Sequence, residues 1–452
     1  MYTQRIKARL LFLIIAALPS TLTVAGRPET VGQPVDIELQ SAHPYAAHSS
    51  SPGEWIVHSA GATYIRIHVS RLDLAPGDSL EIASPDDTQS FMYGARGPHG
   101  DGEFWANTIH GDTAVVRLHA GKGGAYGFSI DQFGRGVIPL LTPPPMSVCG
   151  TTDWQDAVCY DGGPDEAAWV RSGSAAHLLV GCCTQCTGFR VSDSGQYLTA
   201  HACVSDRQTV REVELTHRAG VETCGGPLLD RDFFVHGKRL LDTDPVLGFT
   251  LFSSEDYLGN HCLPLATQPP AVGDVIYIPH YPVDRARKLS IASDQSADGL
   301  CHVNQVTGSG IAYDCDTDAG SAGAPVISPD GQLVTALHTT SGCLGVGTRM
   351  DLIYARIASR LDPCAPVPAT CGNGVIEAGE QCDGADLAGE DCVSRGFFGG
   401  GVLRCNGDCT FDVRECFSDC ALSPHLCNCD GRCTPKEAQG GQCTDCLVDP
   451  PR

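Results

Sequence analysis

Polar and apolar residues alternate in several short stretches of the first third of the chain. The stretch 65–70, IRIHVS, switches between aliphatic and polar residues at every step, and residues 77–82 and 112–120 have a similar character. Clusters of Gly, Pro, Asp and Ser separate these stretches. Because side chains of a β-strand point to opposite faces in turn, the pattern predicts short antiparallel strands. We therefore expect a β-sandwich over residues 34–135.

Short apolar stretches between turn residues also fill the middle of the chain. Examples are HLLVG at 177–181, VIYIPHY at 275–281 and GQLVTALH at 331–338. A Pro-rich linker over residues 136–146 separates this region from the first one. The pattern predicts a second all-β domain over residues 147–363, so the chain as a whole is expected to be mainly β.

The first 25 residues have a different pattern from the rest. Three basic residues precede an apolar run over 10–18, and small residues then form a cleavage-like sequence at 23–25. The run is too short to cross a bilayer, and no later stretch is long and apolar enough to anchor the chain. We predict a signal peptide over residues 1–25, a secreted or cell-surface protein, and no membrane insertion.

Cysteines divide the chain further. None of the 24 cysteines precedes Cys149, eleven lie between Cys149 and Cys343, and thirteen follow from Cys364 onward. In a secreted chain they are expected to form disulfides. The tail reads as two small disulfide-rich modules, 371–416 and 420–446, each with six cysteines.

Net charge narrows the range of partners. The formal charge of the chain is −23, and removal of residues 1–25 takes away three basic and no acidic residues, which gives −26. Such an acidic chain argues against nucleic acid and anionic membranes as partners.

Motifs in the first module resemble those of CUB domains. They occur in the order HPY (43–45), WI (55–56), IRIHVSRLDL (65–74), GDSLEI (77–82) and GFSID (127–131). The module lacks the cysteines common in that family, so we describe it as CUB-like.

Three segments of the middle domain resemble landmarks of secreted bacterial trypsin-like proteases, in the branch of lysyl endopeptidase. They are CTGFRV (186–191) with LTAHAC (198–203), PVLGFTLF (245–252) and GSAGAP (320–325). The resemblance implies a chymotrypsin-like double β-barrel. It also implies a disulfide between Cys186 and Cys203, and it places Cys315 and Cys343 among the disulfide cysteines.

The same resemblance shows which side chains stand at the catalytic positions. The general base, the aspartate and the nucleophile of the family correspond here to Ala202, Gly248 and Ala322. Such a protease needs an imidazole within hydrogen-bond reach of a serine oxygen and a carboxylate that orients the imidazole. None of the three side chains can do this, so we predict an inactive protease homologue.

A rearranged triad of His201, Asp244 and Ser321 is the alternative. Each of His201 and Ser321 lies one place before the expected position, but the matching place for the carboxylate holds Leu247. Neighbouring residues of a strand point to opposite faces, and an error of about 1 Å at a reacting group can cost about a hundredfold in rate. A packed histidine and a loop hydroxyl are the simpler interpretations.

An oxyanion hole does not depend on these side chains. Its donors are backbone N–H groups, here those of Gly320 and Ala322, and they remain if the turn is kept. Such a cleft can hold a peptide carbonyl or a carboxylate. Nearby Asp316 and Asp318 are either part of a pocket for a basic residue or ordinary turn residues.

The tail carries a candidate cation site. The segment CGNGVIEAGEQCDG (371–384) resembles cysteine-rich repeats of secreted bacterial proteins and the calcium-binding pattern of disintegrin-like modules. Four oxygen-bearing side chains are the candidate ligands of a structural Ca²⁺: Asn373, Glu377, Glu380 and Asp383. A solvated acidic turn is the alternative, and no cofactor is required.

The sequence therefore leaves three functional hypotheses. The leading one is an inactive protease homologue that binds a peptide or protein ligand through its cleft. The second is an active endopeptidase with the rearranged triad. The third is a structural or adhesive surface protein that uses the protease fold as a scaffold.

Overall fold

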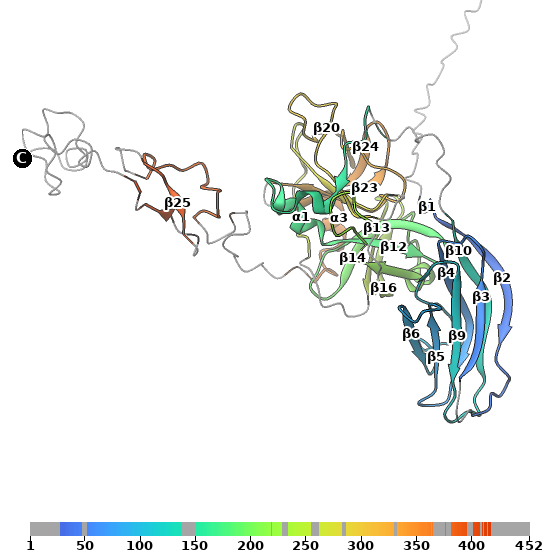
Figure 1. The fold of residues 1–452 in the computed structure, drawn as a ribbon. Helices are drawn as coiled ribbons and strands as arrows, with labels where there is room; N and C mark the ends of the chain where they lie inside the picture. Colours follow the sequence, from blue (N-terminus) through green and yellow to red (C-terminus); the bar gives the residue numbers. More distant parts are fainter. Residues whose placement is uncertain are drawn as a thin grey trace, which may run out of the picture.

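The computed structural model is mainly β, as the alternation predicts (Figure 1). It describes the greater part of the sandwich and of the double barrel and parts of the tail, and these parts are residues 28–47, 52–137, 148, 150–217, 219–227, 234–254, 262–282, 286–329, 332–362, 364, 376, 381–395, 401–406, 409, 411–413 and 415–416. The predicted signal peptide, most of the linker and the module 420–446 lie outside the described residues. No helix among the described residues is long and apolar enough to cross a membrane.

The first module is a sandwich of two antiparallel sheets. One sheet has the order β2 (Gly32–Gln40), β10 (Gly127–Gly136), β4 (Tyr64–Asp73) and β7 (Phe104–Trp105), with β8 (Ile109–His110) also paired to β4. The other has the order β3 (Gly53–His58), β9 (Thr113–His119), β5 (Ser79–Ala83) and β6 (Ser90–Gly94). Alternate residues of the strands, such as Ile65, Ile67 and Val69, form the core between the sheets.

The second module begins with a closed six-stranded barrel. Around the barrel the strands are β12 (Ala175–Val180), β15 (Val213–Thr216), β16 (Val235–Asp244), β17 (Phe249–Ser254), β14 (Gln196–Ala200) and β13 (Thr184–Arg190), which pairs again with β12. The short strand β1 (Glu29–Thr30) comes from the N-terminal side of the sandwich and pairs with β13. In Figure 1, β1 lies where the sandwich meets the barrel.

A second set of strands completes the double barrel. Five strands run in the order β20 (Val303–Val306), β21 (Gly310–Tyr313), β24 (Gly345–Arg349), β23 (Leu333–Thr340) and β22 (Pro325–Ser328). Three more have the order β11 (Gln155–Asp156), β19 (Lys288–Ser290) and β18 (Ile278–His280). A bridge between Tyr277 and Ile327 connects the two groups, and the helix α3 (Met350–Ile357) packs against their apolar core.

The second module has three further short helices, and the described part of the tail contains a two-stranded hairpin. The helices are η1 (Ala157–Tyr160), α1 (Glu166–Ser172) and α2 (Arg207–Arg211). The hairpin pairs β25 (Arg404–Cys405) with β26 (Phe411–Asp412). Seven disulfides join pairs of described cysteines, and they are 159–224, 182–183, 186–203, 262–364, 301–315, 382–405 and 392–416.

The sandwich is attached to the first barrel through a buried arginine. Arg66 lies on the face of β4 that points away from the sandwich core, and its side chain is inaccessible to solvent. Its Nε donates to the carbonyl of Ala106 at 2.9 Å, and its Nη1 donates to the carbonyl of Leu179 in β12 at 3.2 Å. The carboxylate of Glu214 in β15 lies 3.8 Å from Nε. A guanidinium that is removed from water needs such partners, so the contact fixes the two modules in one arrangement.

Replacement of this arginine should destabilise the protein strongly. Arg66→Met leaves the buried Glu214 without its cation, and we expect the free energy of unfolding to fall by about 3 kcal/mol. Urea denaturation followed by tryptophan fluorescence measures the change. Arg71→Met, on an exposed position of the same strand, is the matched control and should cost at most about 1 kcal/mol. Equal effects of the two substitutions would contradict the role of Arg66.

Candidate functional site

The three positions that correspond to a catalytic triad lie together at the junction of the barrels. The N–H of Thr187 in β13 donates to the carbonyl of Ala322 at 3.0 Å, and the N–H of His201 donates to the carbonyl of Gly248 at 2.9 Å. The disulfide between Cys186 and Cys203 ties β13 to the residue that follows Ala202. The predicted landmarks therefore meet in space, although none of them supplies a catalytic side chain.

His201 is held on the side of the first barrel. Its Nδ1 forms a hydrogen bond with the Thr243 hydroxyl at 2.8 Å, and that hydroxyl donates to the carbonyl of Phe249 at 3.1 Å. Ala202, at the position of the general base, is exposed and offers only a methyl group. The imidazole therefore links the residue that follows β14 to Thr243 of β16.

The carboxylates near the third position are also engaged. Asp244 accepts the N–H groups of Val246 at 2.8 Å and Leu247 at 3.0 Å, and the bond from Leu247 is the main reason why its pKa is lowered. Asp242 forms an ion pair with Arg356 at 3.2 Å. Asp244 thus caps a turn, and neither carboxylate forms a hydrogen bond with His201.

Gly248, at the aspartate position, has a left-handed backbone. Its φ angle is +67°, which favours glycine. A Cβ at this place would meet only the methyl group of Thr339, at 3.7 Å. The position therefore has room for a side chain, but its backbone disfavours one.

Ser321 points into the protein interior. Its Oγ lies 2.6 Å from Nδ1 of His280 in β18, and both residues are completely buried. The other ring nitrogen of His280 forms a hydrogen bond with Ser290 Oγ at 3.0 Å, and that hydroxyl donates to the carbonyl of Asp316 at 2.7 Å. The second partner of this imidazole is a hydroxyl and not a carboxylate, and the pair is shielded from solvent.

A second buried histidine supports the same loop from β23. His338 Nε2 forms a hydrogen bond with Ser341 Oγ at 3.2 Å, and Ser341 donates to the carbonyl of Asp318 at 3.1 Å. Burial lowers the pKa of His280 and of His338 to about 3. Two neutral imidazoles therefore hold residues 316–322 in place. In the sequence, His280 and His338 are each the only histidine of an apolar stretch, which indicates a buried histidine. The sequence does not indicate their hydrogen-bond partners.

The proposed oxyanion donors keep a suitable turn. Gly320 has a φ angle of +90°, its carbonyl accepts the Thr187 hydroxyl at 2.9 Å, and a Cβ would come within 2.7 Å of the Tyr281 carbonyl. Among the residues that the structure describes, the N–H groups of Gly320 and Ala322 have no hydrogen-bond acceptor. Two amide donors thus remain on the nucleophile loop.

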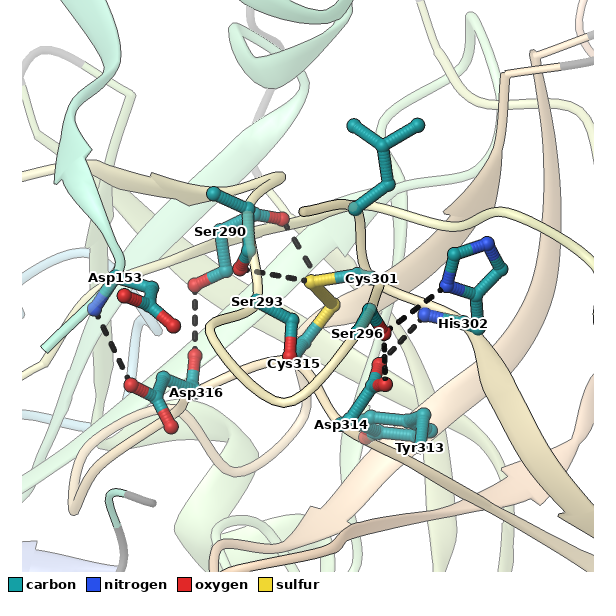
Figure 2. The surroundings of a disulfide bond; sticks show 12 residues. Asp153, Ser290, Ser293, Ser296, Cys301, His302, Tyr313, Asp314, Cys315 and Asp316 are labelled. Carbon is teal, nitrogen blue, oxygen red and sulfur yellow. Dashed lines mark hydrogen bonds between the residues drawn. A yellow bond between two sulfur atoms is a disulfide. The ribbon is translucent and has the colours of Figure 1, made fainter. Parts of the chain in front are cut away.

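The two acidic residues of this loop serve the local fold. Asp316 is buried and accepts the N–H of Asp153 at 3.2 Å, an arrangement that Figure 2 shows. Asp318 accepts the N–H of Ala319 through its carboxylate at 2.8 Å. These contacts are those of turn residues.

The other predicted disulfide cysteines have partners that the sequence did not indicate. Cys315 is bonded to Cys301, fourteen residues earlier, and Figure 2 shows this bond beside Ser290. Cys343 also takes part in a disulfide. Cys182 and Cys183, adjacent in the sequence, are bonded to each other in the turn between β12 and β13.

Only one of the predicted calcium ligands lies within the described residues. Asp383 is buried, and its carboxylate lies 3.6 Å from the sulfur of Cys409. Asn373, Glu377 and Glu380 lie outside the described part of the chain, so the calcium site remains a prediction.

The buried histidines should make the fold sensitive to acid. Between about pH 6.5 and pH 3 the unfolded chain protonates His280 and His338, whereas the folded protein keeps both neutral. The free energy of unfolding is therefore highest above about pH 6.5 and falls as the pH is lowered toward 3. Each histidine should contribute a loss of about 2 kcal/mol at pH 5 relative to pH 7. Urea denaturation at both pH values tests this. His280→Gln should reduce the difference by that amount, whereas the half-exposed control His58→Gln should leave it unchanged. The same pH dependence in all three proteins would refute the assignment.

Comparisons with known proteins agree with this arrangement. Residues 186–335 match the family model of the trypsin-like peptidase domain. Secreted RxLR effector protein 73 of Plasmopara viticola is 24% identical over 318 residues, which cover 64% of this chain and 77% of that protein. Among solved structures, the active form of the Rv3671c protease of M. tuberculosis is 13% identical, with a TM-score of 0.34, and covers 52% of this chain and 97% of its own. A serine endoprotease of Yersinia pestis is also 13% identical, with a TM-score of 0.32, over 44% of this chain and 66% of its own. The match to the family model shows that the chain contains a trypsin-like peptidase domain and is a serine protease homologue.

Proposed function

We propose that this domain is catalytically inactive and binds a peptide or protein ligand. One observation carries the proposal: the triad positions hold Ala202, Gly248 and Ala322, and the nearest substitutes are turned to other partners. The His201 ring is bonded to Thr243, and the Ser321 hydroxyl to a buried histidine. Loss of triad members costs roughly four to six decades in turnover, which leaves no useful protease.

The backbone of the cleft supports a binding role. Gly320 and Ala322 offer N–H groups without acceptors among the described residues, and such paired donors suit a peptide carbonyl or a terminal carboxylate. Recognition of this kind needs only the turn that these two residues form. The proposed ligand is therefore a polypeptide that is held and not cleaved.

We also propose that the protein acts outside the cell. Its disulfides are typical of an oxidising compartment, and the relative from Plasmopara viticola is named a secreted effector. Within this proposal, the protease domain belongs to the lysyl-endopeptidase branch. The CUB-like sandwich and the cysteine-rich repeat then serve adhesion or display at the cell surface.

Two other functions compete with this proposal. An active endopeptidase would have to use His201, Asp244 and Ser321, whose side chains form hydrogen bonds with three different sets of partners. A purely structural or adhesive protein would use the fold without its cleft. The next two experiments separate these functions.

The first experiment is labelling with a fluorophosphonate probe. The purified protein should show no labelling above that of its Ser321→Ala variant and no hydrolysis of casein, because no activated hydroxyl faces the cleft. Trypsin serves as the positive control. Stoichiometric labelling that Ser321→Ala abolishes would overturn the proposal and establish the rearranged triad.

The second experiment tests peptide binding at the turn. Peptides with a free terminal carboxylate should bind the wild-type protein, and Gly320→Ala should weaken the binding at least tenfold because a Cβ collides with the Tyr281 carbonyl. Gly308→Ala is the matched control, since a Cβ there meets no atom within 4 Å. Fluorescence polarisation measures affinity, and thermal unfolding checks that both variants fold. Unchanged binding by Gly320→Ala would favour the scaffold hypothesis.

A further inference from the structure

One edge of the first barrel runs alongside the candidate site. In β13, Cys186 is bonded to the cysteine after Ala202, and the next residue, Thr187, donates its N–H to the carbonyl of Ala322. The strand β14 pairs with β13 only from Gly188 onward. The part of this edge before Thr187 is therefore open to another strand, directly beside the triad positions.

The strand β1 occupies that edge. Glu29 pairs with Gln185 and Thr30 with Thr184, in antiparallel register. The N–H of Val31 then donates to the carbonyl of Cys183 at 2.8 Å. These three residues of the chain make the same kind of backbone contacts that an added peptide strand makes with a sheet edge.

The antiparallel direction brings Glu29 to the end nearest the nucleophile loop. Glu29 is partly buried there, and burial raises its pKa, with a further contribution from the negative charge of Asp318. The register with Gln185 holds the Glu29 side chain at this end of the edge, where the negative charge of Asp318 disfavours its ionised form, so Glu29 is a poor residue for this place. The chain therefore binds its own edge with a mismatched side chain.

A groove lies next to β1. It has a volume of about 760 Å³ and is bordered by Pro28 and Thr30 of the N-terminal segment, by Thr184 and Ala202 of the barrel, and by Trp105 of the sandwich. The N-terminal segment thus forms one wall of a cavity that reaches the position of the lost base. Removal of β1 would join this groove to the open edge of β13.

We infer that β1 is an intramolecular peptide ligand, which occupies the edge of β13 where an external extended polypeptide would add as a strand. This inference rests on the proposed binding function and specifies its partner. The external ligand pairs through its backbone with residues 183–185, and it carries a neutral or basic residue where β1 has Glu29. It competes with β1 for the same edge.

The test uses the synthetic peptide Arg-Pro-Gln-Thr-Val-Gly, which is the sequence 27–32 with glutamine in place of Glu29, labelled with a fluorophore. We compare the intact chain, a chain that begins at Gly32, and the intact chain with Glu29→Lys. The peptide should bind the shortened chain at least tenfold more tightly than the intact chain, because no internal strand competes. Glu29→Lys should bind it at least threefold more weakly than wild type, because a lysine beside Asp318 holds β1 in place. A peptide with proline in place of Val31 is the control and should bind poorly, since it cannot donate to the Cys183 carbonyl.

The possible results separate this inference from the function on which it rests. Equal affinity of all three proteins would overturn the role of β1 and leave the binding function standing. Failure of the peptide to bind the shortened chain would also overturn the role of β1, and the Gly320→Ala experiment would decide the binding function independently. Circular dichroism shows whether the shortened chain folds. If it does not, the affinities of the wild-type protein and of Glu29→Lys for the peptide are compared, and equal affinities would refute the inference.

Discussion

The contact on which the arrangement of this protein depends is the burial of Arg66 between two modules. A guanidinium without solvent needs hydrogen-bond acceptors, and carbonyls of the sandwich and of the barrel accept from its Nε and Nη1. Since the first strand of the sandwich, β2, continues directly from β1, the position of the sandwich also sets the position of β1. The ion pair between Arg66 and Glu214 joins the sandwich to the barrel. It therefore also helps to place β1 at the candidate site.

The nucleophile loop keeps its shape without any help from a triad. Thr187 binds its carbonyls at Gly320 and Ala322, and the buried rings of His280 and His338 connect it to neighbouring strands. None of these contacts uses a group that would be needed for catalysis. No side chain of Ala202, Gly248 or Ala322 takes part in these contacts, so the turn with its two backbone donors is formed without them.

Much of the fold could be predicted from the sequence, and the reasons are local. Alternation in residues 65–70 indicated a strand of a sandwich, and the spacing of Cys186 and Cys203 located the first barrel. The glycines of GSAGAP marked a turn that only glycine adopts easily, as the φ angle of Gly320 shows. These signals arise from backbone geometry within a few residues, which the sequence displays directly.

The features that escaped prediction depend on contacts between distant segments. Arg66 occupies a polar place in an alternating strand, and only the barrel explains its burial. Cys315 has its partner at Cys301, which no motif marks. The two residues of β1 have no strand pattern at all, because their conformation is imposed by pairing with a strand more than 150 residues later. Tertiary context decided each of these cases.

The strength of β1 as an internal ligand can be judged from its few contacts. Each backbone hydrogen bond contributes about 1 kcal/mol, and burial of Val31 beside Tyr64 and Leu179 adds about 2 kcal/mol. A total near 4 kcal/mol corresponds to a dissociation constant of about 1 mM. A single residue joins β1 to β2, so the effective concentration of β1 lies above the millimolar value of a short flexible linker, and the docked state predominates. A strand with these few contacts covers the edge of β13 against non-specific pairing. A polypeptide with a neutral or basic residue near Asp318 can displace it, because Glu29 fits that place poorly.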